Sequence, residues 1–137
     1  MRIGAETRGG DIAARILVID GDAAARAALS ETLAVEMAAT PQLDGVSSGR
    51  GAAELLRAAR YDALLIDLDS LADLSPAADE AVARLVRLAA GALVLALSGA
   101  NSISTAMAAM RAGAHDFAVR PLSGRAIAER LSDMADR

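Results

Sequence analysis

Polar side chains follow four apolar runs of this sequence. Asp20 and Asp22 follow ILVI, Asp67 ends ALLID, Ser98 follows LVLAL, and Arg120 follows DFAV. Carboxylates without a lysine or histidine beside them suit a hard cation such as Mg²⁺, which takes one or two carboxylates and keeps several waters. A carboxylate can also attack phosphorus and form an acyl phosphate. In such a site Mg²⁺ would neutralise phosphoryl oxygens, while the Ser98 hydroxyl and the Arg120 guanidinium would bind the rest.

The elements that would position these side chains alternate between two periods. Short, β-rich apolar runs predict strands at 15–20, 43–47, 63–67, 92–97 and 116–119. Between and after them, apolar residues at helical spacing predict five helices, each with an inward-facing apolar stripe. The third helix is expected to begin with Ser75 as its N-cap and Pro76 as its first residue. The stripes are Leu29, Leu33, Met37; Ala52, Leu55, Leu56, Ala59; Val82, Leu85, Val86, Ala89; Ile103, Met107, Met110; and Ile127, Leu131, Met134.

Strands that are almost wholly apolar and alternate with amphipathic helices are typical of a parallel sheet covered on both faces. The sequence therefore predicts a single α/β domain with a doubly wound, five-stranded parallel sheet. In such folds ligands bind beyond the carboxyl ends of the strands, where the strand order reverses. The five polar residues all lie at or just after strand ends, so we expect them to meet at this edge.

Composition excludes several classes of protein. The 137 residues suffice for one domain, and with no Trp, one Phe and one Tyr the core must be aliphatic. The absence of Cys excludes disulfides and thiolate metal sites. A net charge of −4 with scattered arginines argues against nucleic-acid binding by this segment. All 14 basic residues are arginine.

Two segments bear on location. Residues 1–14 contain charges and glycines but no apolar signal-peptide core, so we expect a flexible N-terminal tail, a domain over 15–137 and a cytoplasmic location. Residues 88–110 are uncharged over a length that could span a bilayer. The turn-forming cluster SGANS divides this stretch into a strand and a helix, so we expect no membrane span.

Four motifs, in order and at the right spacing, resemble the receiver domains of two-component response regulators. They are RILVIDGDAAAR, YDALLIDLD, LVLALSGA and AGAHDFAVRPLS, and the resemblance covers residues 15–136. The segment NSISTAMAAMRAGAHDF is similar to N-terminal receivers of nitrogen-regulation-type regulators. The resemblance implies a flavodoxin-like receiver fold with strand order 2-1-3-4-5. It also implies a histidine kinase or phosphotransfer protein as partner.

The resemblance also implies roles for individual residues. Asp67 would be the phosphoacceptor, assisted by Ser98 and Arg120, and Ser98 with Phe117 would form the conformational switch. Magnesium would be held by Asp20, Asp67 and the backbone carbonyl of Asp69, with Asp22 as a further candidate. Any enzymatic activity would be Mg²⁺-dependent self-phosphorylation and dephosphorylation at Asp67.

Three positions depart from the family pattern. Gly21 stands where the family has its principal metal-binding acid, so we expect Mg²⁺ to bind weakly or not at all. Arg120 stands where the family has lysine, and its longer planar guanidinium is expected to fold into the pocket and pair with Asp67 or Asp20, through up to two parallel hydrogen bonds. The loop at 68–73 also lacks the usual Met-Pro-like turn and glycine.

These departures leave two functions open. The first is a receiver that is phosphorylated at Asp67. The second is a pseudo-receiver, an interaction or dimerisation module that works without phosphorylation and in which Asp20 and Asp67 merely accept hydrogen bonds. An unrelated enzyme on the same fold would need a glycine-rich cofactor loop after the first strand, and DGDAAA is not one.

Other polar residues have simpler interpretations. Ser98 could cap the following helix, although Asn101 and Ser102 lie nearer its start, and His115 is expected at the surface. Phe117 could be core alone. The arginines of the last two helices are expected on a solvated face that could also mediate a homodimer through the fourth and fifth helices; they are Arg111, Arg125 and Arg130.

Overall fold

The computed structural model describes residues 14–37, 39–99 and 102–136, and within them strands and helices alternate along the chain. The strands are β1 (Arg15–Ile19), β2 (Gln42–Val46), β3 (Ala63–Asp67), β4 (Leu93–Ser98) and β5 (Asp116–Val119). The helices are α1 (Ala23–Glu36), α2 (Gly49–Ala58), α3 (Ala78–Leu88), α4 (Ile103–Arg111) and α5 (Gly124–Ala135), with a short 3₁₀ helix, η1 (Leu68–Ser70), directly after β3.

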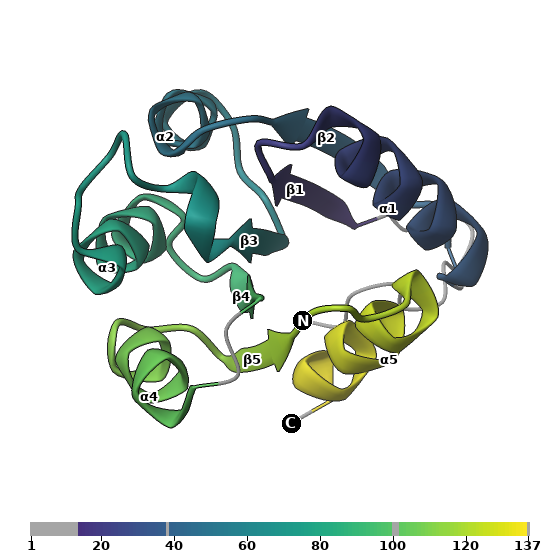
Figure 1. The fold of residues 1–137 in the computed structure, drawn as a ribbon. Coiled ribbons are helices and arrows are strands. Elements are labelled where there is room, and N and C mark those ends of the chain that lie inside the picture. The colour runs from purple at the N-terminus through teal and green to yellow at the C-terminus, as the bar shows by residue number, and fades with distance from the viewer. Residues whose placement is uncertain (1–13, 38, 100–101, 137) are drawn as a thin grey trace.

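The strands form one parallel sheet in the order β2-β1-β3-β4-β5. Helices α1 and α5 cover one face of this sheet, and α2, α3 and α4 cover the other (Figure 1). The predicted doubly wound fold and strand order are therefore confirmed. The order reverses beside β1, whose two neighbours are β2 and β3, so the expected ligand edge lies at the carboxyl ends of β1 and β3.

Alternate residues of the central strands supply two aliphatic cores. Leu17, Ile19, Leu64 and Ile66 face α2 and α3, while Ile16, Val18 and Leu65 face α1 and α5. The stripes predicted on the first, second, third and fifth helices supply the opposing side chains; those that are buried are Leu33, Met37, Ala52, Leu56, Val82, Leu85, Ala89, Ile127, Leu131 and Met134. Burial on both faces explains why the strands are apolar throughout.

Element boundaries differ from the predicted ones by one residue at most for the strands, and β3 and β5 match fully. The predicted start of the third helix is wrong. Helix α3 begins at Ala78, and its N-cap residue Ala77 provides no side-chain hydrogen bond. The Ser75 hydroxyl instead accepts from the Ala77 N–H at 3.3 Å, which closes a turn before the helix begins.

The predicted inward stripe of the fourth helix is also wrong. Ile103, Met107 and Met110 are 81%, 51% and 44% exposed, whereas Ala109 is buried. The face of α4 that packs on the domain consists of small side chains, so the larger apolar residues lie on the outer side. Both stripes have helical spacing, and spacing alone does not tell which of them is covered.

Residues 88–110 contain the end of α3, strand β4 and most of α4. Within the described residues, no helix is long and apolar enough to cross a membrane. Of the predicted tail, residues 1–13 lie outside the described part. Ala14 is buried, and its carbonyl accepts a hydrogen bond from the Gln42 N–H at 2.8 Å.

Candidate functional site

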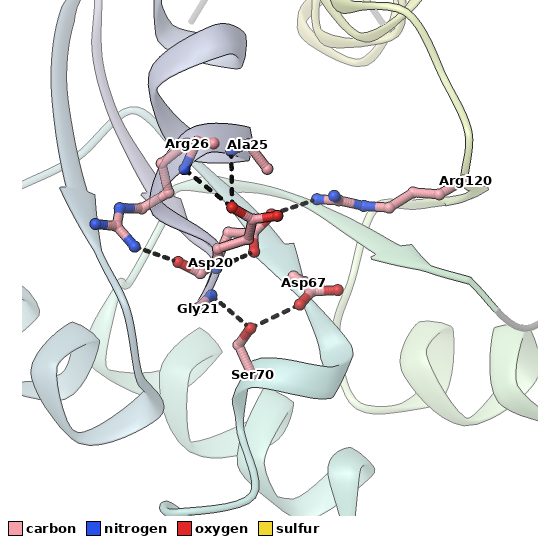
Figure 2. A network of polar contacts seen from close by, with 9 residues as sticks. Asp20, Gly21, Ala25, Arg26, Asp67, Ser70 and Arg120 are labelled. Atoms are coloured by element: carbon pink, nitrogen blue, oxygen red, sulfur yellow. Dashed lines mark hydrogen bonds and ion pairs between the residues drawn. The ribbon is translucent and has the colours of Figure 1, made fainter.

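The sheet brings the predicted polar residues to one edge. Ile19 of β1 pairs with Ile66 of β3, so Asp20 and Asp67 are the next residues of neighbouring strands. Ser98 is the last residue of β4, and the Arg120 N–H donates to its carbonyl at 2.8 Å. Figure 2 shows Asp20, Asp67 and Arg120 gathered at this edge, with Ser70 beside them, and this group of residues is called the pocket below.

Asp20 is the buried acid of this pocket, only 5% exposed. Its Oδ1 accepts from the Asp22 N–H at 2.9 Å, and its Oδ2 forms an ion pair with Arg120 Nη2 at 3.0 Å. The Arg26 guanidinium donates to the Asp20 backbone carbonyl at 2.7 Å (Figure 2). Both carboxylate oxygens therefore have protein partners, as a buried charge requires.

The predicted ion pair between Arg120 and the acidic pocket is confirmed, with Asp20 as its partner. Its geometry differs from the predicted fork, because a single guanidinium nitrogen contacts the carboxylate. Nε of Arg120 is buried and has no hydrogen-bond partner within the described part of the chain. Arg120 thus acts mainly as a counter-charge, as a lysine would, although it approaches with a longer side chain.

Asp67 is held by a different contact. Its Oδ2 accepts a short hydrogen bond from the Ser70 hydroxyl, 2.6 Å long, and the Ser70 oxygen accepts from the Gly21 N–H at 2.8 Å (Figure 2). Asp67 is half-buried at the end of β3, in keeping with its sequence position. Sequence reasoning missed Ser70, and the only signal was a hydroxyl three residues after the acid.

The other predicted site residues lie nearby in different settings. Ser98 is buried, 3% exposed. The helix after it is capped by Ser102, whose hydroxyl accepts from the Thr105 N–H at 3.3 Å, while Asn101 lies outside the described residues. Phe117 is half-buried and packs against the core on the α2–α4 side of the sheet.

The carboxylates of Asp22 and Asp69 lie in other settings, and the role of the Asp69 backbone carbonyl as a metal ligand stays a prediction. The Asp22 carboxylate caps α1, accepting from the N–H groups of Ala24 and Ala25. Asp69 is exposed within η1. Among the described residues, no group of three or more His, Cys, Asp or Glu side chains is arranged to hold a metal ion. With a guanidinium on Asp20 and a hydroxyl on Asp67, this arrangement of donors does not fit Mg²⁺.

The altered loop after β3 has its own anchor in Asp73, which sequence reasoning also missed. Its carboxylate accepts from the backbone N–H groups of Gly49 and Arg50, at 2.9 and 3.0 Å, at the start of α2. These contacts, that of Arg50 foremost, lower the pKa of the Asp73 carboxyl. The anchor joins the rim of the pocket to the neighbouring helix.

Outside the pocket, two of the arginines considered above are exposed, whereas a third arginine and the histidine make contacts with the sheet. Arg111 and Arg125 are exposed, as predicted. Arg130 is not merely solvated, because it forms an ion pair with Asp116 at 3.1 Å and donates to the Phe117 carbonyl. His115 is exposed, as predicted, while its Nδ1 accepts from the backbone of β4.

Comparison with solved structures identifies the fold. A CheY-like receiver domain protein from Methanospirillum hungatei has a TM-score of 0.78 at 18% identity, over 90% of this chain and 94% of that one. A response regulator from Burkholderia pseudomallei, determined with a phosphorylated aspartic acid, a calcium ion and citrate, has a TM-score of 0.76 at 23% identity, over 90% and 69%. CheY4 of Vibrio cholerae has a TM-score of 0.74 at 20% identity, over 88% and 98%.

These likenesses define a CheY-like receiver fold. Residues 16–132 match the family described as response regulator receiver domain, whereas no curated protein matches the chain. The chain therefore belongs to the receiver domains of response regulators. The resemblance to nitrogen-regulation-type receivers stays a prediction.

Proposed function

We propose that this receiver domain works through contacts that do not depend on phosphorylation, as a pseudo-receiver. The observation that carries the proposal is the ion pair between Arg120 and the buried carboxylate of Asp20. The protein's own cation lies against the acid that would otherwise face a metal ion.

The charges of the pocket disfavour a bound metal ion. Mg²⁺ needs carboxylate ligands in near-octahedral geometry and gives up its water reluctantly. To reach Asp20 it would have to displace a guanidinium, and Gly21 supplies no carboxylate in compensation. We therefore expect Mg²⁺ to bind weakly or not at all at millimolar concentration. A titration followed by the amide shifts of Asp20 and Asp67 measures this.

A second candidate function is phosphorylation at Asp67, favoured by the position of this residue. Its carboxylate is half-buried at the end of β3, and the neighbouring strand β4 ends at Ser98. In that reaction a carboxylate oxygen of Asp67 would attack the phosphorus of a phosphohistidine. The P–N bond would break, its electron pair would stay on the imidazole, and a P–O bond would form on Asp67.

Phosphorylation by acetyl phosphate discriminates between the two functions. The variants are Gly21→Asp, Arg120→Lys and their combination, with Asp67→Asn as the control that lacks the acceptor. A Cβ at Gly21 would meet only ordinary contacts, at 3.4 Å from Ser70 Oγ and 3.5 Å from the Ser47 carbonyl oxygen, so the aspartate can be accommodated.

We expect slow or no phosphorylation of the wild type by mass spectrometry, and a larger gain in the double variant than the two single gains combined, because the two changes act on one pocket. If the wild type is phosphorylated at Asp67 as fast as the double variant, the pocket is competent as it stands and the pseudo-receiver function is rejected.

Partners follow from the family and from the surface. A histidine kinase or phosphotransfer protein is the partner that the second candidate function requires, whereas for the pseudo-receiver we propose a homodimer through α4 and α5. The dimer is supported by the exposed apolar stripe of α4, formed by Ile103, Met107 and Met110. Light scattering across a concentration series tests it: Met107→Gln should shift a dimer towards monomer, and a wild type that stays monomeric at all concentrations contradicts it.

A further inference from the structure

We infer that Ser70 is a positioning residue that clamps Asp67 to the loop between β1 and α1, a role that no family motif of this sequence provides. Its hydroxyl joins the turn after β3 to the loop before α1, and the two residues in contact, Ser70 and Gly21, are 49 positions apart in the sequence. The inference deepens the proposed function. The clamp itself depends only on the two hydrogen bonds, whereas its effect on a metal site rests on the proposed function.

Both hydrogen bonds of the clamp can form at once. A hydroxyl has one proton and two acceptor lone pairs, whereas a backbone N–H can only donate. The Gly21 N–H therefore uses a lone pair of Ser70 Oγ, and the hydroxyl proton is left for Asp67 Oδ2. A distance of 2.6 Å is typical of a hydroxyl that donates to an ionised carboxylate.

The turn that carries Ser70 is fixed by its neighbours. Leu68 and Leu71, on either side of it, are both buried, and the Leu71 N–H donates to the Leu68 carbonyl at 3.4 Å. The hydroxyl is therefore presented to the pocket by a packed turn. The clamp uses a different carboxylate from the Arg120–Asp20 ion pair, although Gly21 directly follows Asp20 in the chain.

The clamp lies beside position 21, where this chain has glycine in place of the family's metal-binding acid. A Cβ at Gly21 would lie 3.4 Å from Ser70 Oγ, so a side chain at this position begins beside the hydroxyl. An acid at position 21 would therefore lie next to the Ser70 hydroxyl, which already binds the Asp67 carboxylate. We expect Ser70 to hinder the two acids from binding one cation together. Restoring that acid alone should leave Asp67 bound to the hydroxyl, so that the metal site is only partly recovered.

Amide hydrogen exchange tests the clamp directly. In Ser70→Ala we expect the Gly21 amide to exchange about tenfold faster, the loss of one hydrogen bond. Ser70→Thr keeps a hydroxyl and should retain the protection. The matched control is Ser75→Ala, which removes a hydroxyl bonded to Glu80 and Ala77 in the same loop and should leave Gly21 unchanged. Protection of the β4 amides reports that each variant is folded. Equal Gly21 exchange in the wild type and Ser70→Ala overturns the inference.

A second measurement tests the coupling with Mg²⁺ alone. We expect Gly21→Asp/Ser70→Ala to bind Mg²⁺ about tenfold more tightly than Gly21→Asp, because one hydrogen bond no longer competes for Asp67. Equal affinities refute the coupling. Rapid phosphorylation of the wild type would reject the proposed function and leave the exchange result standing, so the two failures are distinguishable.

Discussion

Replacing Arg120 by methionine should destabilise the domain through the charge it leaves behind. Methionine keeps most of the length of the side chain but removes the cation. The Asp20 side chain is 6% exposed, and without Arg120 its carboxylate keeps, among the described residues, the Asp22 N–H as its one partner. Removing one member of a fully buried ion pair costs about 3–5 kcal/mol. Because the Arg120 side chain is 32% exposed, water can partly replace it, and we expect about 2 kcal/mol.

The assay is a double-mutant cycle in urea with the wild type, Arg120→Met, Asp20→Asn and the double variant. The double variant has no buried charge to satisfy, so it should be more stable than Arg120→Met by about 1 kcal/mol. The chain contains a matched control in Arg125, whose ion pair with Glu129 spans 3.5 Å between largely exposed side chains. Arg125→Met should change the free energy of unfolding by less than about 0.5 kcal/mol.

Equal stability of the Arg120→Met and Arg125→Met proteins would contradict this expectation. It would mean that the Asp20 carboxylate does not depend on Arg120 for its charge balance. The guanidinium would then be no obstacle to a metal ion, and the main support for the proposed function would be lost.

Two further predictions concern stability away from the pocket. Burial, together with a hydrogen bond to Asp44, raises the pKa of Tyr61 to about 12. The unfolded pKa is about 10, so the native phenol keeps its proton to higher pH, and the stability that this provides below pH 10 should be lost between about pH 10 and 12. With no Lys or Cys and one Tyr in the chain, urea unfolding against pH isolates this effect, and Tyr61→Phe should abolish the slope; an unchanged slope contradicts the assignment. Gly124→Ala would place a Cβ 2.5 Å from the Thr32 Cβ and should cost about 1–3 kcal/mol in the same assay. A Cβ at Gly99 would meet no atom of the described residues within 4 Å, so Gly99→Ala should be neutral; equal effects would show that α1 and α5 adjust freely.

The sequence predicted most of the fold because the strands and helices of this chain differ in both period and composition. The run ALLID over 63–67 is apolar up to its last residue, and it is β3 with those bounds. The error at α4 has a physical cause. Ile103, Met107 and Met110 have the spacing of a buried stripe, but alanine and other small side chains on the opposite side allow the helix to pack there instead.

The pocket was predictable to the extent that it depends on strand ends. Parallel strands place their carboxyl ends together, so Asp20, Asp67 and Arg120 converge for reasons visible in the sequence. The role of Ser70 was not predictable in this way. It requires a 3₁₀ turn directly after β3, and a backbone N–H at Gly21 from a loop 49 residues away.

The two restraints of the pocket have one electrostatic consequence. Asp20 and Asp67 bring two negative charges to neighbouring strand ends, and Arg120 neutralises one of them while a neutral hydroxyl holds the other. A phosphoryl group on Asp67 would replace the single carboxylate charge with about two negative charges, a net gain of about one. Within the described pocket, the cation that could meet them is Arg120, and it could do so only by leaving the buried Asp20 carboxylate. We therefore expect the contact that stabilises the resting domain to oppose phosphorylation, and this expected opposition is why we propose that the domain acts through its surface.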